Sequence, residues 1–234
     1  MRLTSFGLLS CLALAGCNED PGVPEVTPLY RPVAEGEPSS GERGSMMINE
    51  IHFAGSMSDE GVYDADDIFI ELLNKHPRPI NVSGWRIEVD GDLNASYRIP
   101  VVEEPIEPNA YFVIARKRDG AFADAADVFI ESLDLGQKEV YVELRDQDRR
   151  LMEDGGSTEQ RAFTGGFDGV TARSMERVQL IFGNRGTTAR NWHAYSQDIG
   201  TETVAEGWRD YTLASPGTAN SVDYSGNSSS GNFE

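Results

Sequence analysis

Cysteine is almost absent from this sequence, and the position of its two copies excludes several classes of site. The chain has 234 residues, and its cysteines are Cys11 and Cys17. Cys11 lies within an apolar N-terminal leader and Cys17 directly follows it. After removal of the leader one cysteine remains, which can form neither an intrachain disulfide nor a cysteine zinc site. The folded part must therefore rely on its hydrophobic core, for which the chain is long enough.

Histidine is also scarce, and the usual catalytic motifs are missing. The only histidines are His52, His76 and His193, far apart and outside any His-x-His or His-Glu-x-x-His spacing. The chain has no Gly-x-Ser-x-Gly nucleophile motif and no glycine-rich phosphate loop followed by Lys-Ser or Lys-Thr. We therefore expect a protein that is not an enzyme, and we expect His52 either to serve packing or to lie exposed at a strand edge.

Basic residues are few, which bears on the partners of the protein. Lysine and arginine together number 20 against 39 aspartates and glutamates, so the formal net charge is −19. A surface this acidic repels nucleic-acid phosphates and anionic head groups. We expect no nucleic-acid partner. The charge favours solubility, cation binding or basic partners.

The longest apolar run is too short to cross a membrane. It extends over 3–15 after the basic Arg2, whereas a transmembrane helix needs about 20 residues. This pattern is typical of a secretory signal peptide, which we place at 1–16. A simple secretory signal that happens to end near a cysteine is one interpretation.

The other interpretation comes from the end of the run. Leu14-Ala15-Gly16-Cys17 resembles the lipobox of bacterial lipoproteins. The resemblance implies that the leader is cut before Cys17 and that Cys17 is the site of lipid attachment, which leaves no free thiol. Two or three acyl chains anchor firmly, because each buried CH₂ contributes about 0.8 kcal/mol. Asn18 rather than aspartate follows Cys17, and under enteric-type sorting the resemblance implies the outer membrane. We expect a lipid-anchored protein of the bacterial cell envelope.

Short apolar runs separated by turn signals fill residues 46–222 and predict an all-β domain. Residues 17–45, rich in Pro, Gly, Glu and Ser, predict a flexible tether, and the polar residues 223–234 a disordered tail. After the leader, the only helical structure expected is a single turn within 117–127. Strands are expected at 46–53, 68–73, 80–89, 97–100, 110–115, 128–135, 139–144 and 174–182.

The strand at 68–73 organises the rest of the domain. Ile68, Ile70 and Leu72 share one face, and Phe69, Glu71 and Leu73 share the other. Because both faces are largely apolar, this strand is predicted to be central. Glu71 is the exception, since a carboxylate in such a strand must be paired or reach water.

Seven short motifs, in order, resemble the lamin-tail domain, an immunoglobulin-like β-sandwich found in nuclear lamins and in many secreted bacterial proteins. The resemblance covers about 46–222, with two long insertions at 54–66 and 155–171. It implies an immunoglobulin-like β-sandwich that acts as a structural or binding module, with no catalytic residues. The motifs are Ile48-Asn49-Glu50-Ile51, Phe69-Ile70-Glu71-Leu72-Leu73-Asn74, Ile80-Asn81-Val82-Ser83-Gly84-Trp85, the run 106–115, the run 140–146, Ala172-Arg173-Ser174-Met175-Glu176-Arg177 and Ser215-Pro216-Gly217-Thr218-Ala219-Asn220.

Within these motifs we expect a structural set of side chains. Trp85 is expected in the core between the sheets, where a large aromatic dominates burial. Asn74 and Asn220 are expected to cap turns. The full structural set is Glu71, Asn74, Gly84, Trp85, Pro216, Gly217 and Asn220.

An acidic loop before the central strand offers one candidate metal site. Asp64, Asp66 and Asp67 could present hard oxygens to Ca²⁺. The loop lacks the Asp-x-Asp-x-Asp-Gly pattern with a distal glutamate, so a solvated acidic loop is the other interpretation. No cofactor besides this possible calcium is expected.

Together these observations predict a lipid-anchored structural or interaction module of the cell envelope, without catalysis of its own. Its partner would be a protein or an envelope polymer. Two alternatives remain open, a calcium-dependent adhesin and an accessory to an envelope hydrolase or nuclease.

Overall fold

The computed structural model describes residues 43–178, 185–196 and 201–224. The predicted signal peptide, Cys17, nearly all of the tether and most of the C-terminal tail lie outside these residues. Among the helices that are described, none is long and apolar enough to span a bilayer.

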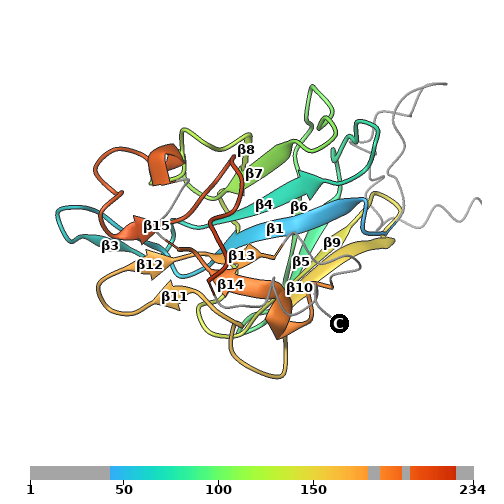
Figure 1. Cartoon of the computed structure of the whole chain (residues 1–234). Coiled ribbons are helices and arrows are strands. Elements are labelled where there is room, and N and C mark those ends of the chain that lie inside the picture. The colour runs from blue at the N-terminus through green and yellow to red at the C-terminus, as the bar shows by residue number, and fades with distance from the viewer. Residues whose placement is uncertain (1–42, 179–184, 197–200, 225–234) are drawn as a thin grey trace, which may run out of the picture.

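The larger sheet has six strands in the order β14-β13-β1-β4-β7-β8 (Figure 1). All neighbours in it are antiparallel except β7 and β8. Strand β4 lies between β1 and β7, which confirms the central strand predicted from its two apolar faces. The strands are β1 (Met46–His52), β4 (Phe69–Asn74), β7 (Tyr111–Ala115), β8 (Val128–Phe129), β13 (Met175–Arg177) and β14 (Trp192–Ala194).

The smaller sheet has four antiparallel strands in the order β10-β9-β5-β6. In β5, the buried Ile87 and Val89 alternate with the half-buried Arg86 and Glu88. One face of this sheet is therefore packed and the other is solvated, as is common for antiparallel sheets. The strands are β5 (Arg86–Gly91), β6 (Ala95–Arg98), β9 (Val140–Arg145) and β10 (Leu151–Gly156).

The main core lies between the two sheets and makes the domain a β-sandwich, as predicted. It joins Ile48 and Ile51 of the larger sheet to Ile87 and Val142 of the smaller one. Trp85 is fully buried in this core, as the sequence predicts. Gly84 turns the chain in front of it at φ +75°, a conformation that glycine adopts readily.

The second face of the larger sheet is covered as well. Phe69 and Val113 pack there against Phe122, Val204 and Ala214, which lie outside the sheet. The single helical turn expected within 117–127 is instead a run of turns. The predicted strand at 128–135 is also shorter, because the chain turns after Val128–Phe129.

The two insertions form short strands of their own and lie side by side at one end of the molecule (Figure 1). The ring of Tyr63 stacks on that of Phe167, with 4.3 Å between centroids. Met57 N donates to Thr212 Oγ1 at 2.8 Å, which ties the first insertion to the C-terminal region. The remaining elements are β2 (Ser56–Met57), β3 (Tyr63–Asp64), β11 (Gly166–Phe167), β12 (Ala172–Arg173), β15 (Thr212–Leu213) and the 3₁₀ helices η1 (Ala189–Asn191) and η2 (Thr201–Thr203).

Candidate functional site

Two of the three aspartates proposed as calcium ligands are neutralised by basic side chains. The Asp64 carboxylate bonds to the Lys117 ammonium, and Asp66 Oδ1 lies 3.0 Å from Arg116 Nη1. Desolvation is the largest single effect and opposes ionisation of Asp64, but the hydrogen bonds from Lys117 and from the Asp66 backbone, together with the charges of Lys117 and Arg116, outweigh it and lower the pKa of Asp64. These two side chains are therefore parts of ion pairs.

The third aspartate, Asp67, points into the protein. Its Oδ2 accepts hydrogen bonds from Ser56 Oγ at 2.6 Å and from Ala121 N at 2.7 Å, and burial raises its pKa. A side chain at Gly120 would collide with Asp67 Oδ1, which is 2.2 Å from the position of the missing Cβ. The three aspartates thus diverge, and no group of three acidic, histidine or cysteine side chains in the described residues could hold a metal ion.

Three glutamates instead form a buried carboxylate row across the larger sheet. Glu50 on β1 lies opposite Glu71 on β4 and opposite Glu176 on β13, and all three are fully buried. Opposite residues in antiparallel strands have Cβ atoms about 5 Å apart. Burial, reinforced by the charge of Glu176, raises the pKa of Glu50 to about 8. Burial also raises the pKa values of Glu71 and Glu176.

A C-terminal strap, residues 213–222, covers this row. It crosses all three strands that carry the glutamates and supplies them with hydrogen-bond donors. Carboxylates buried without such donors are strongly destabilising. The backbone N–H donors are Ser215 to Glu50 at 3.0 Å, Gly217 to Glu71 at 2.6 Å and Ser221 to Glu176 at 3.2 Å.

The strap turns sharply at the Pro-Gly motif. Thr218 N donates to Ser215 O at 3.1 Å, with Pro216 and Gly217 at the two central positions of the turn. Gly217 has φ +77°, the value that a type II turn requires at this position. The turn aims the Gly217 N–H at Glu71. The two expected motif residues of the strap therefore shape the backbone that binds the carboxylates.

Asn49 on β1 and Asn220 on the strap bind each other and the neighbouring strands. Asn49 Nδ2 donates to Glu71 Oε1 and to Asn220 Oδ1, both at 2.6 Å. Asn220 Nδ2 donates to Arg177 O at 2.8 Å, so Asn220 ties the strap to β1 and β13 and does not cap a turn of its own. Asn74 does cap a turn, as predicted, since its Oδ1 accepts from His76 N at 2.8 Å.

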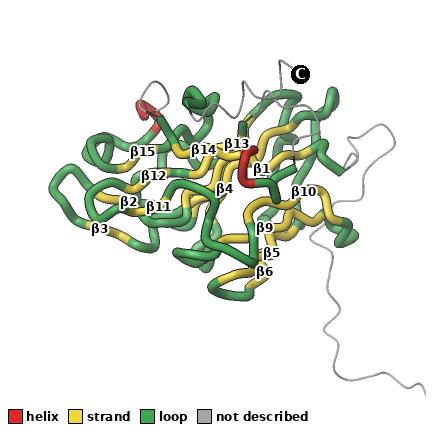
Figure 2. Tube along the Cα trace, turned by 60° about the horizontal axis from the view of Figure 1, so that its bottom comes forward, coloured by secondary structure: helices red, strands yellow, loops and turns green. Residues whose placement is uncertain are grey.

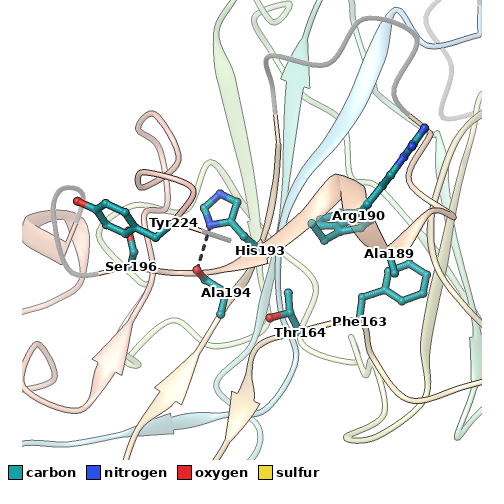
Figure 3. A pocket seen from close by; sticks show the side chains of 9 residues that line it. Phe163, Thr164, Ala189, Arg190, His193, Ala194, Ser196 and Tyr224 are labelled. Carbon is teal, nitrogen blue, oxygen red and sulfur yellow. Dashed lines mark hydrogen bonds between the residues drawn. The ribbon is translucent and has the colours of Figure 1, made fainter. Parts of the chain in front are cut away.

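A hollow lies beside the end of the row, along β14 (Figure 3). Its volume is about 550 Å³, and His193 and Tyr224 are on its wall. His193 Nδ1 lies 3.0 Å from Ala194 O and 3.7 Å from Glu176 Oε2. The Ser196 hydroxyl, also on the wall, donates to Val222 O. This hydroxyl is therefore engaged by the backbone and is not aligned with His193 as a nucleophile would be.

His52 is a packing residue, as expected. Its ring packs against those of Phe69 and Phe122, with centroid distances of 5.7 Å and 4.7 Å, and these two rings also contact each other at 4.6 Å. Nε2 lies 2.6 Å from Gly55 O, and burial lowers the pKa of His52 to about 4.

Sequence reasoning found Glu71 but did not single out Glu50 and Glu176 as site residues. A signal was present, because each is an acidic residue inside one of the seven motifs, as Glu71 is. No protein-family model matches the chain, and the comparison with curated proteins finds no match. The interpretation of the site therefore depends on its geometry.

Proposed function

We propose that this protein is a lipid-anchored structural or interaction module of the bacterial cell envelope, with a lamin-tail-like β-sandwich and no catalysis of its own. One observation carries the proposal. Polar residues from four of the seven motifs that resemble the lamin-tail family meet in the buried carboxylate row and its strap. Their hydrogen-bonding groups hold the strap on the sheet. This use suits a rigid scaffold that presents its surface to a partner.

The localisation to the envelope in this proposal depends on the lipobox at Cys17. Cys17→Ser removes the thiol that carries the lipid, so the variant is expected in the soluble fraction while the wild type sediments with the outer membrane. Cys11→Ser, within the leader, is the matched control and should remain anchored. A membrane-bound Cys17→Ser variant, together with a wild type that incorporates no labelled palmitate, would contradict the proposal.

The partner in this proposal is a protein or an envelope polymer. Cross-linking with mass spectrometry on intact cells should recover covalent adducts to surface residues of the sandwich. The Cys17→Ser variant is the control, because a protein released from the envelope loses access to partners fixed there. An identical adduct pattern for both forms would argue against a role at the envelope.

A further inference from the structure

The solvated face of the smaller sheet places like charges opposite one another on neighbouring strands. These charges form one basic row and one acidic row across the strands. The two rows hold residues that are two apart on each strand, share a face of the sheet and lie about 7 Å apart. The rows come from the antiparallel register of β10, β9, β5 and β6, which lie away from β3 and β15 (Figure 2). The basic row is Arg145, Arg86 and Arg98. The acidic row is Asp154, Glu143 and Glu88, and on β6 it ends at the uncharged Ser96.

Like charges directly opposite on neighbouring strands destabilise a sheet. Arg145 is compensated by Glu143, whose Oε2 lies 2.5 Å from Arg145 Nη2. Asp154 is compensated by Arg43, whose Nη2 lies 3.0 Å from Asp154 Oδ2. Within the described part of the chain, Arg86 has no carboxylate and Glu88 no cation at ion-pair distance. Both reach only Ser96 Oγ, at 3.0 Å each. Strand β5 therefore presents one positive and one negative half-buried side chain that are bridged by the Ser96 hydroxyl and form no direct ion pair.

We infer that this face binds a second copy of the chain through a two-fold axis that runs parallel to the two rows and midway between them. Rotation about this axis exchanges the rows, so the basic row of each copy lies on the acidic row of the other. Each strand of one copy lies over the same strand of the other copy. Arg86 then faces Glu88 of the second copy and Arg145 faces its Glu143, and each contact occurs twice, as in any isologous interface.

Charge complementarity selects this occupant over others. A polyanion attracted by the basic row meets repulsion from the acidic row, and a basic partner meets the opposite. A suitable partner carries both signs in parallel rows with the spacing of a β-strand, and a second copy has this pattern by construction. The inference goes beyond the proposed function and does not depend on the lipid anchor.

Charge reversal tests the inference sharply. The test uses the full chain carrying Cys17→Ser, with self-association measured by sedimentation velocity over a range of concentrations. Arg86→Glu and Glu88→Arg each turn two attractive contacts into repulsive ones. Each variant should weaken self-association by about tenfold or more. An equimolar mixture of the two variants should associate again. In the mixed dimer the two reversed side chains face each other with opposite charges, and so do the unchanged glutamate of the first variant and the unchanged arginine of the second.

Arg118 and Glu131 provide the matched control. They form a largely exposed ion pair outside the smaller sheet, with Arg118 Nε 3.2 Å from Glu131 Oε1. Arg118→Glu and Glu131→Arg change the net charge by the same amounts and should leave self-association unchanged. Thermal melting checks that every variant is folded. A wild type that stays monomeric at every concentration, or a mixture that associates no better than its components, would overturn the inference.

Discussion

One serine hydroxyl contacts two glutamates of the buried carboxylate row. Ser215 Oγ lies 3.2 Å from Glu50 Oε2 and 2.5 Å from Glu176 Oε1. The hydroxyl has one hydrogen to donate, so the second contact is a hydrogen bond only if a glutamate is protonated. Burial raises the pKa values of all three glutamates, that of Glu50 to about 8, so the row favours a bound proton near neutral pH.

The raised pKa of Glu50 makes stability depend on pH, with a definite sign. In the unfolded chain a glutamate titrates near pH 4.3, so the contribution of Glu50 is fully present below that pH. Between that pH and about 8 the unfolded chain has lost the proton that the folded protein keeps. Folding then loses on the order of 1 kcal/mol per pH unit. Above about pH 8 the Glu50 contribution no longer changes.

Glu50→Gln should remove this part of the pH dependence, because the amide does not titrate and keeps the size of the carboxyl. Urea unfolding at about pH 5, 6.5 and 8 is the measurement. The wild type should lose stability relative to Glu50→Gln as the pH rises. Glu131→Gln, in the exposed ion pair with Arg118, is the control and should follow the wild type. Parallel curves for wild type and Glu50→Gln would show that Glu50 titrates normally.

Trp85→Ala should be among the most damaging single changes. The side chain is fully buried between the sheets, and such a truncation costs about 3–5 kcal/mol through lost burial and a cavity. Trp208→Ala serves as the comparison, because Trp208 is only half-buried, beside the residues that cover the second face of the larger sheet. Chemical denaturation should show a clearly smaller loss for Trp208→Ala. Equal losses would contradict the assignment of Trp85 to the main core.

At the scale of elements, the C-terminal strap completes the larger sheet. It adds no strand over the glutamates, yet its turn and backbone donors satisfy carboxylates on β1, β4 and β13. The sheet supplies the hydrogen-bond acceptors and the strap supplies the donors. Without the strap, the buried carboxylates lose these donors.

Deleting 214–234 should therefore destabilise the fold severely, because three buried glutamates lose their donors. Deleting only 225–234 leaves the strap intact and is the control. Circular dichroism melts should show a large fall in melting temperature, or no transition, for the longer deletion and little change for the shorter one. If the longer deletion does not fold, Ser215→Ala should still show a loss of about 1–3 kcal/mol. A Ser215→Ala variant that melts at the wild-type temperature would contradict the role of the strap.

The acidic segment around β3 is not expected to bind calcium. Asp64, Asp66 and Asp67 are held by separate partners, so calcium has no preformed set of ligands there. The melting temperature of the wild type should be the same in millimolar calcium and in chelator. A calcium-dependent rise that Asp66→Asn abolishes would instead restore the calcium site suggested by the sequence.

At the scale of the whole molecule, one core joins the two sheets. Trp85 precedes β5 in the smaller sheet and Trp192 begins β14 in the larger one, and both belong to this core. The described domain is therefore expected to unfold in one cooperative step. In a Trp208→Phe background, tryptophan fluorescence and far-ultraviolet circular dichroism should give the same midpoint in urea. Two separated midpoints would show that the sheets unfold independently.

The sequence by itself determined the class of fold and the local conformations. Alternation of apolar residues predicts the strands, the two apolar faces of 68–73 predict the central position of β4, and the Asn74 cap follows from local turn chemistry. These features depend on neighbours along the chain, so local physics is sufficient.

Tertiary structure decided which acidic groups meet. Asp64, Asp66 and Asp67 are close in sequence, but the turns between them aim their side chains at different partners. Glu50, Glu71 and Glu176 lie far apart in sequence and become neighbours only through strand register, which a bulge between Ile48 and Glu50 adjusts. Burial then sets their pKa values, because the cost of a charge depends on the surrounding medium. Register and burial are properties of the assembled sheets.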